Sequence, residues 1–172
     1  MLGIIGVIAE LERDTIAKRT KDGRWEAFEE GVVLGSGAPY GYTKDERKKY
    51  KVLEPEACVV RDIFSMFVYE GRSIAGIARY LEERKILSPA ASAVVHKKHN
   101  REARKKNSDY FWGAGTVRRL LAEEIYVGMI YGNKYQKGKI LDKSERVLSR
   151  TAAPVIVDAI LFDKAQRILS QS

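Results

Sequence analysis

Arginine and lysine side chains are the groups in this sequence whose spacing could support chemistry, and that chemistry is anion binding. Arg118 and Arg119 are adjacent in a segment with helical spacing of apolar residues. A guanidinium group can bind a phosphate or read a guanine edge through two parallel hydrogen bonds. The alternative is that these are ordinary solvent-facing charges on helices.

A further basic cluster lies in a stretch of low hydrophobicity at about residues 88–109. Between Lys97 and Lys106 there are six basic side chains and one acidic side chain. The basic residues are Lys97, Lys98, Arg101, Arg104, Lys105 and Lys106. This composition is typical of a solvated loop and also of a segment that contacts a polyanion.

The charge distribution favours a polyanionic partner. The 172-residue chain has a net charge of +8, and residues 1–31 hold five basic and seven acidic side chains, which leaves +10 for residues 32–172. A positive surface of this size attracts nucleic acid, because neutralised phosphates release condensed counterions. An ordinary basic protein without such a partner is the alternative.

The sequence predicts neither a metal site nor a cofactor. His96 and His99 have H-x-x-H spacing but no cysteine or acidic cluster beside them. Cys58 is the only cysteine, which excludes an internal disulfide, and we interpret it as a small core residue. No stretch approaches the length of apolar sequence that a membrane span requires. We therefore expect a soluble, cytoplasmic protein.

The elements that position these side chains begin with one long helix over residues 1–31, about 45 Å in length at the usual rise per residue. Its first third is apolar on nearly all sides. Its second half is polar, with Trp25 and Phe28 as exceptions. Glycines then predict an extended, mobile linker over residues 32–38.

Residues 39–172 predict one mixed domain. A strand is expected at 50–53 and a helix from Pro55, followed by a second helix that Ser73 caps and Arg84 ends. After the insert, Thr116 is expected to cap a short helix carrying Arg118 and Arg119. Strands are expected at 126–131, 134–141 and 154–157, before a closing helix with Phe162, Ala165 and Leu169 on its buried face. The fold class is thus α+β and mainly helical, with a helix-turn-helix variant whose turn is enlarged.

Several segments resemble the large serine recombinases of the resolvase/invertase superfamily. Residues 8–20 with Gly23 are similar to the long helix that ends their catalytic domain, in the pattern A-E-x-E-R-x-x-I-x-x-R-x-x-x-G. Pro39-Tyr40-Gly41-Tyr42 resembles the opening of their "recombinase" DNA-binding domain. Similar segments follow in the same order at 54–57, 60–64, 73–78, 112–121 and 126–128. The resemblance covers almost the whole chain.

The resemblance implies a sequence-specific, DNA-binding part of a site-specific recombinase from a bacterium or phage, associated with the nucleoid. It implies double-stranded DNA as partner, with Arg19, Lys21, Arg24, Tyr40 and Tyr42 as contact candidates beside the basic insert and Arg118 with Arg119. It also implies self-association through the first helix, with Ile4, Ile5, Ile8 and Leu11 as contact candidates. Both an integrase and a transposon recombinase are compatible with it.

The family's serine nucleophile belongs to a catalytic domain that does not precede Met1, so we expect a fragment without enzymatic activity of its own. The alternative is an oligomerisation module that assembles through its first helix without specific DNA binding. Salt-dependent binding of DNA by the isolated chain would separate the two.

Overall fold

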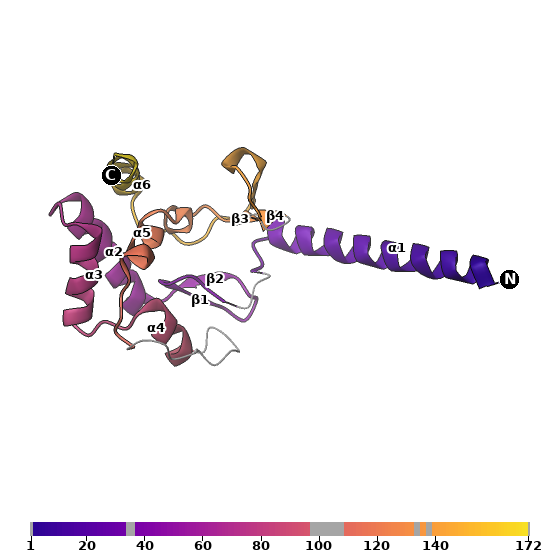
Figure 1. Cartoon of the computed structure of the whole chain (residues 1–172), viewed down its shortest axis with the longest axis horizontal. Helices are drawn as coiled ribbons and strands as arrows, with labels where there is room; N and C mark the ends of the chain where they lie inside the picture. Colours follow the sequence, from indigo (N-terminus) through magenta and orange to yellow (C-terminus); the bar gives the residue numbers. More distant parts are fainter. Residues whose placement is uncertain (1, 34–36, 97–108, 133–134, 137–138, 172) are drawn as a thin grey trace.

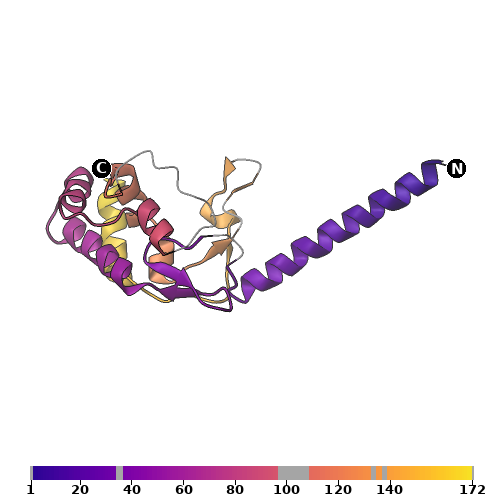
Figure 2. The same cartoon turned by 90° about the horizontal axis from the view of Figure 1, so that it is seen from below.

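A long helix, α1 (Leu2–Glu29), projects from a domain that contains the other elements (Figures 1 and 2). The computed structural model describes residues 2–33, 37–96, 109–132, 135–136 and 139–171, and it describes side chains from Glu10 onward except Leu11, 135–136, 139–140 and Lys143. The predicted helix is confirmed. Gly31 follows it with a φ of 83°, a conformation that favours glycine and stops the helix.

Four helices build the core. They are α2 (Glu54–Val68), α3 (Ile74–Glu83), α5 (Ala114–Leu121) and α6 (Ala159–Ser170). Helix α2 packs against α6, and α3 packs against α5. The predicted Ser73 cap is confirmed, because its hydroxyl accepts a hydrogen bond from the Gly76 amide at 3.1 Å. The closing helix also buries its predicted residues Phe162, Ala165 and Leu169.

The strands form three separate two-stranded antiparallel sheets in the described residues. In the first, β1 (Tyr42–Lys44) pairs with β2 (Tyr50–Val52), with Thr43 opposite Lys51. In the second, β3 (Tyr131–Gly132) pairs with β6 (Val147–Leu148). The third joins β4 (Tyr135–Gln136) to β5 (Lys139–Ile140), and a short 3-10 helix, η2 (Lys143–Glu145), precedes β6. The fold is therefore α+β and mainly helical, as predicted.

Two predicted strands are wrong. Most of 126–131 is not extended, because η1 (Glu124–Val127) is a 3-10 helix that ends at Gly128 with a φ of 92°. Its tight turn buries both Ile125 and Tyr126. Residues 154–157 wrap around this turn without strand pairing, since the amides of Ile156 and Val157 both donate to the Tyr126 carbonyl at 2.9 and 3.0 Å.

The basic insert does not begin as a loop. Helix α4 (Pro89–Val95) occupies its start, with Ser88 as N-cap and Ser92 as its buried residue. The rest of the insert, residues 97–108, lies outside the described residues.

Two smaller predictions are also wrong. Helix α5 begins after Gly113 rather than at Thr116. Cys58 is exposed on α2, whereas its neighbours Ala57 and Val60 are buried in the core. The apolar face of α2 therefore turns away from Cys58, because residues 57 and 60 share one side of the helix.

A buried carboxylate joins the first turn of α2 to two other segments. Glu56 is 3% exposed, and one of its oxygens accepts a hydrogen bond from the Gly41 amide at 2.6 Å. The other oxygen accepts from the Ser92 hydroxyl of α4. Its position in the first turn also places negative charge at the positive end of the helix. Glu56 thereby holds the 39–42 turn, α2 and α4 together.

Three tyrosines extend this connection across the domain. The Tyr42 hydroxyl lies within hydrogen-bond distance of two carbonyl oxygens, those of Ile125 (2.9 Å) and Pro154 (2.7 Å). The Tyr126 hydroxyl donates to the Tyr40 carbonyl at 2.9 Å, and the rings of Tyr42 and Tyr126 are stacked. These bonds satisfy backbone groups of segments that have no regular strand or helix to pair them.

Replacing Glu56 by alanine should destabilise the domain. The Gly41 amide and the Ser92 hydroxyl would each lose a buried partner, at a cost of about 1–3 kcal/mol per group. Glu54→Ala is the matched control, because Glu54 lies in the same turn with its side chain 65% exposed and should change stability by only about 0.5 kcal/mol. Urea titration followed by circular dichroism measures both. Equal losses for the two variants would contradict the bridging role of Glu56.

The tyrosine network predicts loss of stability at alkaline pH. Burial, with a smaller contribution from neighbouring Tyr50, raises the pKa of the Tyr42 hydroxyl well above its ordinary value of 10.0. The unfolded chain therefore ionises first, and the stabilisation that is present below pH 10.0 is lost as the pH rises toward the folded-state pKa. The free energy of unfolding should therefore fall as the pH rises above about 10, and it should fall less in Tyr42→Phe. Tyr69→Phe, at an exposed tyrosine, should leave the pH dependence unchanged.

Candidate nucleic-acid interface

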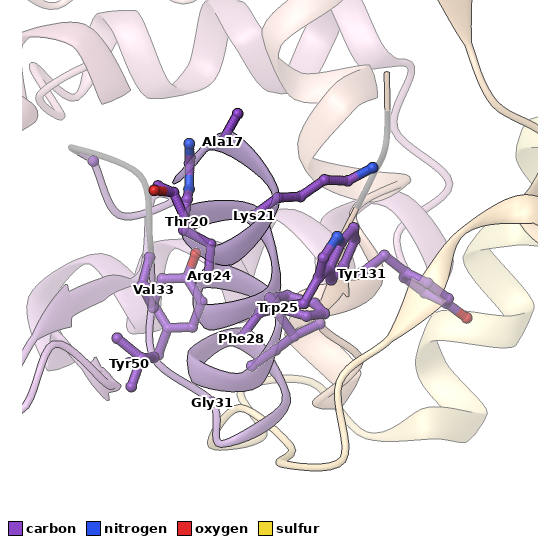
Figure 3. A pocket seen from close by; sticks show the side chains of 14 residues that line it. Ala17, Thr20, Lys21, Arg24, Trp25, Phe28, Gly31, Val33, Tyr50 and Tyr131 are labelled. Atoms are coloured by element: carbon purple, nitrogen blue, oxygen red, sulfur yellow. The ribbon is translucent and has the colours of Figure 1, made fainter. Parts of the chain in front are cut away.

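A groove of about 670 Å³ lies where the last turns of α1 meet the domain (Figure 3). The side chains of Trp25 and Phe28 contribute its aromatic wall on α1, with their rings edge to face at a centroid distance of 5.7 Å. Tyr50 of β2 and Tyr131 of β3 line the groove from the domain. The groove therefore has four aromatic side chains in its lining and is formed jointly by α1 and the two sheets.

Two of the three predicted cationic residues of α1 belong to this groove. Lys21 and Arg24 line it, and both side chains are exposed to solvent. Arg19 is also exposed, but successive helical residues turn by about 100°, which places it on the opposite side of α1 from Lys21. The structure thus brings Lys21 and Arg24 together and separates Arg19 from them.

Helix α5 presents a second cationic surface. Val117, Leu120 and Leu121 are buried against the core, while Arg118 and Arg119 are exposed on the outer side. Ahead of them, Ala114 and Gly115 are also exposed, and a Cβ added at Gly115 would meet no atom within 4 Å. The outward face of α5 therefore combines two guanidinium groups with small residues that allow a close approach.

Consecutive residues at the end of the linker line both the groove beside α1 and a second cavity beside α5. Gly37 lines the groove beside α1, and the next residues, Ala38 and Pro39, line a cavity of about 290 Å³ together with Arg119. Pro89, the first residue of α4, lies in the same cavity. The consecutive residues Gly37, Ala38 and Pro39 therefore line first the groove and then the cavity that Arg119 lines.

The resemblance predicts Tyr40 and Tyr42 as DNA contacts, but both side chains are buried, and Tyr40 lines the 290 Å³ cavity beside Arg119 whereas Tyr42 does not. Tyr40 is 7% exposed and Tyr42 is fully buried, and their hydroxyl groups are hydrogen-bonded within the protein. The Tyr40 ring packs edge to face on Trp112, whose indole nitrogen donates to the Ile86 carbonyl at 2.9 Å. The motif at 39–42 therefore belongs to the core, because its two aromatic rings pack on Trp112 and Tyr126.

The remaining predicted contacts fall where side chains are not described. The insert residues Lys97, Lys98, Arg101, Arg104, Lys105 and Lys106 lie outside the described residues, and for Ile4, Ile5, Ile8 and Leu11 the structure places only the helical backbone. Within the described part of the chain, no three His, Cys, Asp or Glu residues are grouped so that they could hold a metal ion. Likewise, none of the helices in that part is long and apolar enough to cross a bilayer.

Sequence reasoning missed the aromatic part of the groove. Trp25 and Phe28 interrupt the polar half of α1, which is the signal that could have indicated a contact surface there. Tyr50 and Tyr131 carry no such signal, because each lies in a short strand with ordinary strand composition. Only the approach of α1 to β2 and β3 brings these four rings together.

Comparison with known proteins identifies the family. The Recombinase family profile matches residues 54–172, and the chain belongs to this family. A "Putative DNA recombinase" of Bacillus subtilis (strain 168) is 30% identical over 173 residues, which is 97% of this chain and 33% of that protein. The chain therefore spans about a third of the length of this relative.

Two solved structures share the fold. One is described as a crystal structure of an LSR–DNA complex, with a TM-score of 0.55 and 18% identity over 90% of this chain and 42% of that chain. The other concerns the sequence requirements of the Listeria innocua prophage attP site, with a TM-score of 0.54 and 20% identity over 90% of this chain and 52% of that chain. The chain is thus a member of the Recombinase family, as the resemblance predicted, and its fold is similar to those of the two solved structures.

Proposed function

We propose that this chain is a DNA-binding part of a site-specific serine recombinase and that it recognises duplex DNA at a recombination site. The observation that carries the proposal is the pair of exposed arginines, Arg118 and Arg119, on the outward face of α5, together with Lys21 and Arg24 in the groove beside α1. Membership of the Recombinase family and a fold shared with an LSR–DNA complex support the same assignment.

The two surfaces have different roles in this proposal. Lys21 and Arg24 contact the phosphate backbone, where positive charge adds affinity without reading sequence. Helix α5 enters the adjacent major groove with Arg118 and Arg119, while α3, which packs against it, crosses the backbone as the first helix of a helix-turn-helix does. The basic insert at 97–106 adds phosphate contacts, and Arg19 contacts DNA from the opposite side of α1.

Strand cleavage and rejoining are assigned to other parts of a recombinase. The chain spans a third of its Bacillus relative, and we propose that this third supplies DNA recognition without catalysing the reaction. The start of α1, with Ile4, Ile5, Ile8 and Leu11, supplies the contact through which subunits associate. The protein acts on DNA in the bacterial cytoplasm, at the nucleoid.

Selection from random duplexes at two salt concentrations tests the function. We expect an enriched half-site whose binding weakens at the higher salt, because base contacts define the sequence and phosphate contacts release counterions. Weak binding that is blind to sequence would contradict specific recognition by this chain. Concentration-dependent dimers without DNA affinity would favour an oligomerisation module instead.

Paired substitutions separate the two surfaces. Arg118→Ala with Arg119→Ala should relax sequence preference, at a cost of about 1–3 kcal/mol for each arginine that reads a base edge. Lys21→Ala with Arg24→Ala should weaken binding to all sequences alike and reduce the slope of log affinity against log salt by about 2. Fluorescence anisotropy with the selected site and a scrambled site measures both effects.

Lys164→Ala with Arg167→Ala is the matched control for net charge. Both residues are exposed on α6, so the pair removes the same charge from a helix outside the proposed interface. It should change affinity much less than either test pair. An equal loss of affinity in all three pairs would show that net charge, rather than these two surfaces, governs binding.

A further inference from the structure

The C-terminal end of α1 is held by residues more than a hundred positions away in the sequence. The Ser149 hydroxyl donates to the Phe28 carbonyl at 2.9 Å, and the Thr151 hydroxyl donates to the Glu29 carbonyl at 3.3 Å. The last carbonyls of a helix have no partner within the helix. Residues 149 and 151 therefore cap α1 from outside it.

The Ser149 hydroxyl has its direction set by a second hydrogen bond. Its oxygen accepts from the Thr151 amide at 3.2 Å, so its single proton is available for the Phe28 carbonyl. The Ser149 amide in turn donates to the Ile130 carbonyl at 2.8 Å, which ties this segment to the stretch before β3. Ser149 is 8% exposed, so the cap is shielded from competing water.

Two glycines let the domain close tightly around the same turn of α1. A Cβ at Gly31 would lie 2.7 Å from the Cβ of Thr151, and a Cβ at Gly132 would lie 2.9 Å from ring atoms of Phe28. A side chain at Gly31 would force Thr151 to shift, and a side chain at Gly132 would force the rings of Phe28 and Trp25 to move. The last turn of α1 is therefore enclosed on two sides.

The chain immediately after α1 is held as well. The Val33 amide donates to the Lys48 carbonyl in the β1–β2 turn at 2.9 Å. Arg150 also forms an ion pair with Glu29 at 3.2 Å, although both side chains are exposed and such a pair contributes little. Val32 and Val33, which the sequence predicts to belong to an extended, mobile linker, are therefore hydrogen-bonded to α1 and to the β1–β2 turn.

We infer that Gly132, Ser149 and Thr151 form a socket that sets the direction in which α1 leaves the domain. Ser149 and Thr151 are positioning residues, since they act on α1 and not on a ligand. Because α1 has 28 residues and is about 42 Å long, a tilt of about 10° at the socket would move its far end by about 7 Å. The socket therefore determines where the start of α1 lies relative to α5.

The socket has a consequence for DNA binding only if the proposed function is correct, so this part of the inference rests on that function. When the direction of α1 is fixed, Lys21 and Arg24 lie at a constant distance from Arg118 and Arg119. The two pairs can then contact a duplex only at positions separated by that distance. The socket itself is independent of DNA and can be tested without it.

The distance between spin labels on α1 and the domain measures the direction of α1. Labels at Asp22→Cys and Glu82→Cys occupy exposed positions on α1 and α3, in a Cys58→Ser background that removes the exposed native cysteine. Pulsed electron–electron double resonance should give one narrow distance for this labelled parent. Ser149→Ala with Thr151→Val should broaden the distribution of label-to-label distances. Thr151→Ser, which keeps the hydroxyl, should leave the distribution narrow.

Ser170→Ala is the control for loss of a capping hydroxyl. Ser170 donates to the Arg167 carbonyl at 2.8 Å within the last turn of α6, so its replacement removes a similar bond and leaves α1 unaltered. Gly132→Ala is a second test that keeps both hydroxyls in place and should shift the distance, because the added methyl group meets Phe28. Circular dichroism confirms that each variant is folded.

A narrow, unshifted distance in both the double variant and Gly132→Ala would overturn the socket. DNA affinity of the same proteins separates this result from the proposed function. If the labelled parent binds no DNA but shows the narrow distance that the double variant loses, the socket stands and the proposed function fails.

Discussion

The buried carboxylate of Glu56 is the interaction on which the domain depends. A charged group removed from water is costly unless hydrogen bonds replace its hydration, and Glu56 obtains them from Gly41 and Ser92. Its place in the first turn of α2 adds the favourable field of the helix terminus. Because each donor comes from a different segment, satisfying one carboxylate requires the 39–42 turn and α4 to dock on α2 together.

The tyrosine network provides hydrogen-bond partners for backbone groups of the irregular segments. Residues 152–157 and η1 run through or beside the core without a strand to pair their backbone groups, and the hydroxyl of Tyr42 together with the Tyr126 carbonyl provides the partners. Gly41 permits this arrangement with a φ of 95°, and its close contact with Ile156 leaves no room for a side chain. The domain can therefore be mainly helical and still bury long stretches of loop.

This rigid core determines where the two cationic surfaces lie. Helix α5 is amphipathic, so burying its apolar face against α3 turns Arg118 and Arg119 outward. Helix α1 has almost no apolar face of its own in its described second half, and it is held only where its last turn enters the domain. The proposed interface thus combines α5, which is packed into the core, with α1, which is held at its C-terminal end. The linker residues Gly37 and Ala38 line the pockets beside these two helices.

Local chemistry in the sequence was sufficient to determine α1, α2, α3 and α6, because apolar periodicity, a proline in the first turn and a serine cap act within one helix. The family motifs and the outward position of Arg118 and Arg119 were also readable without coordinates. Only the tertiary structure decided the burial of Tyr40 and Tyr42, the coil at 154–157 and the socket around α1. Each of these depends on hydrogen bonds or packing between residues far apart in the chain, and a sequence pattern records no such distances.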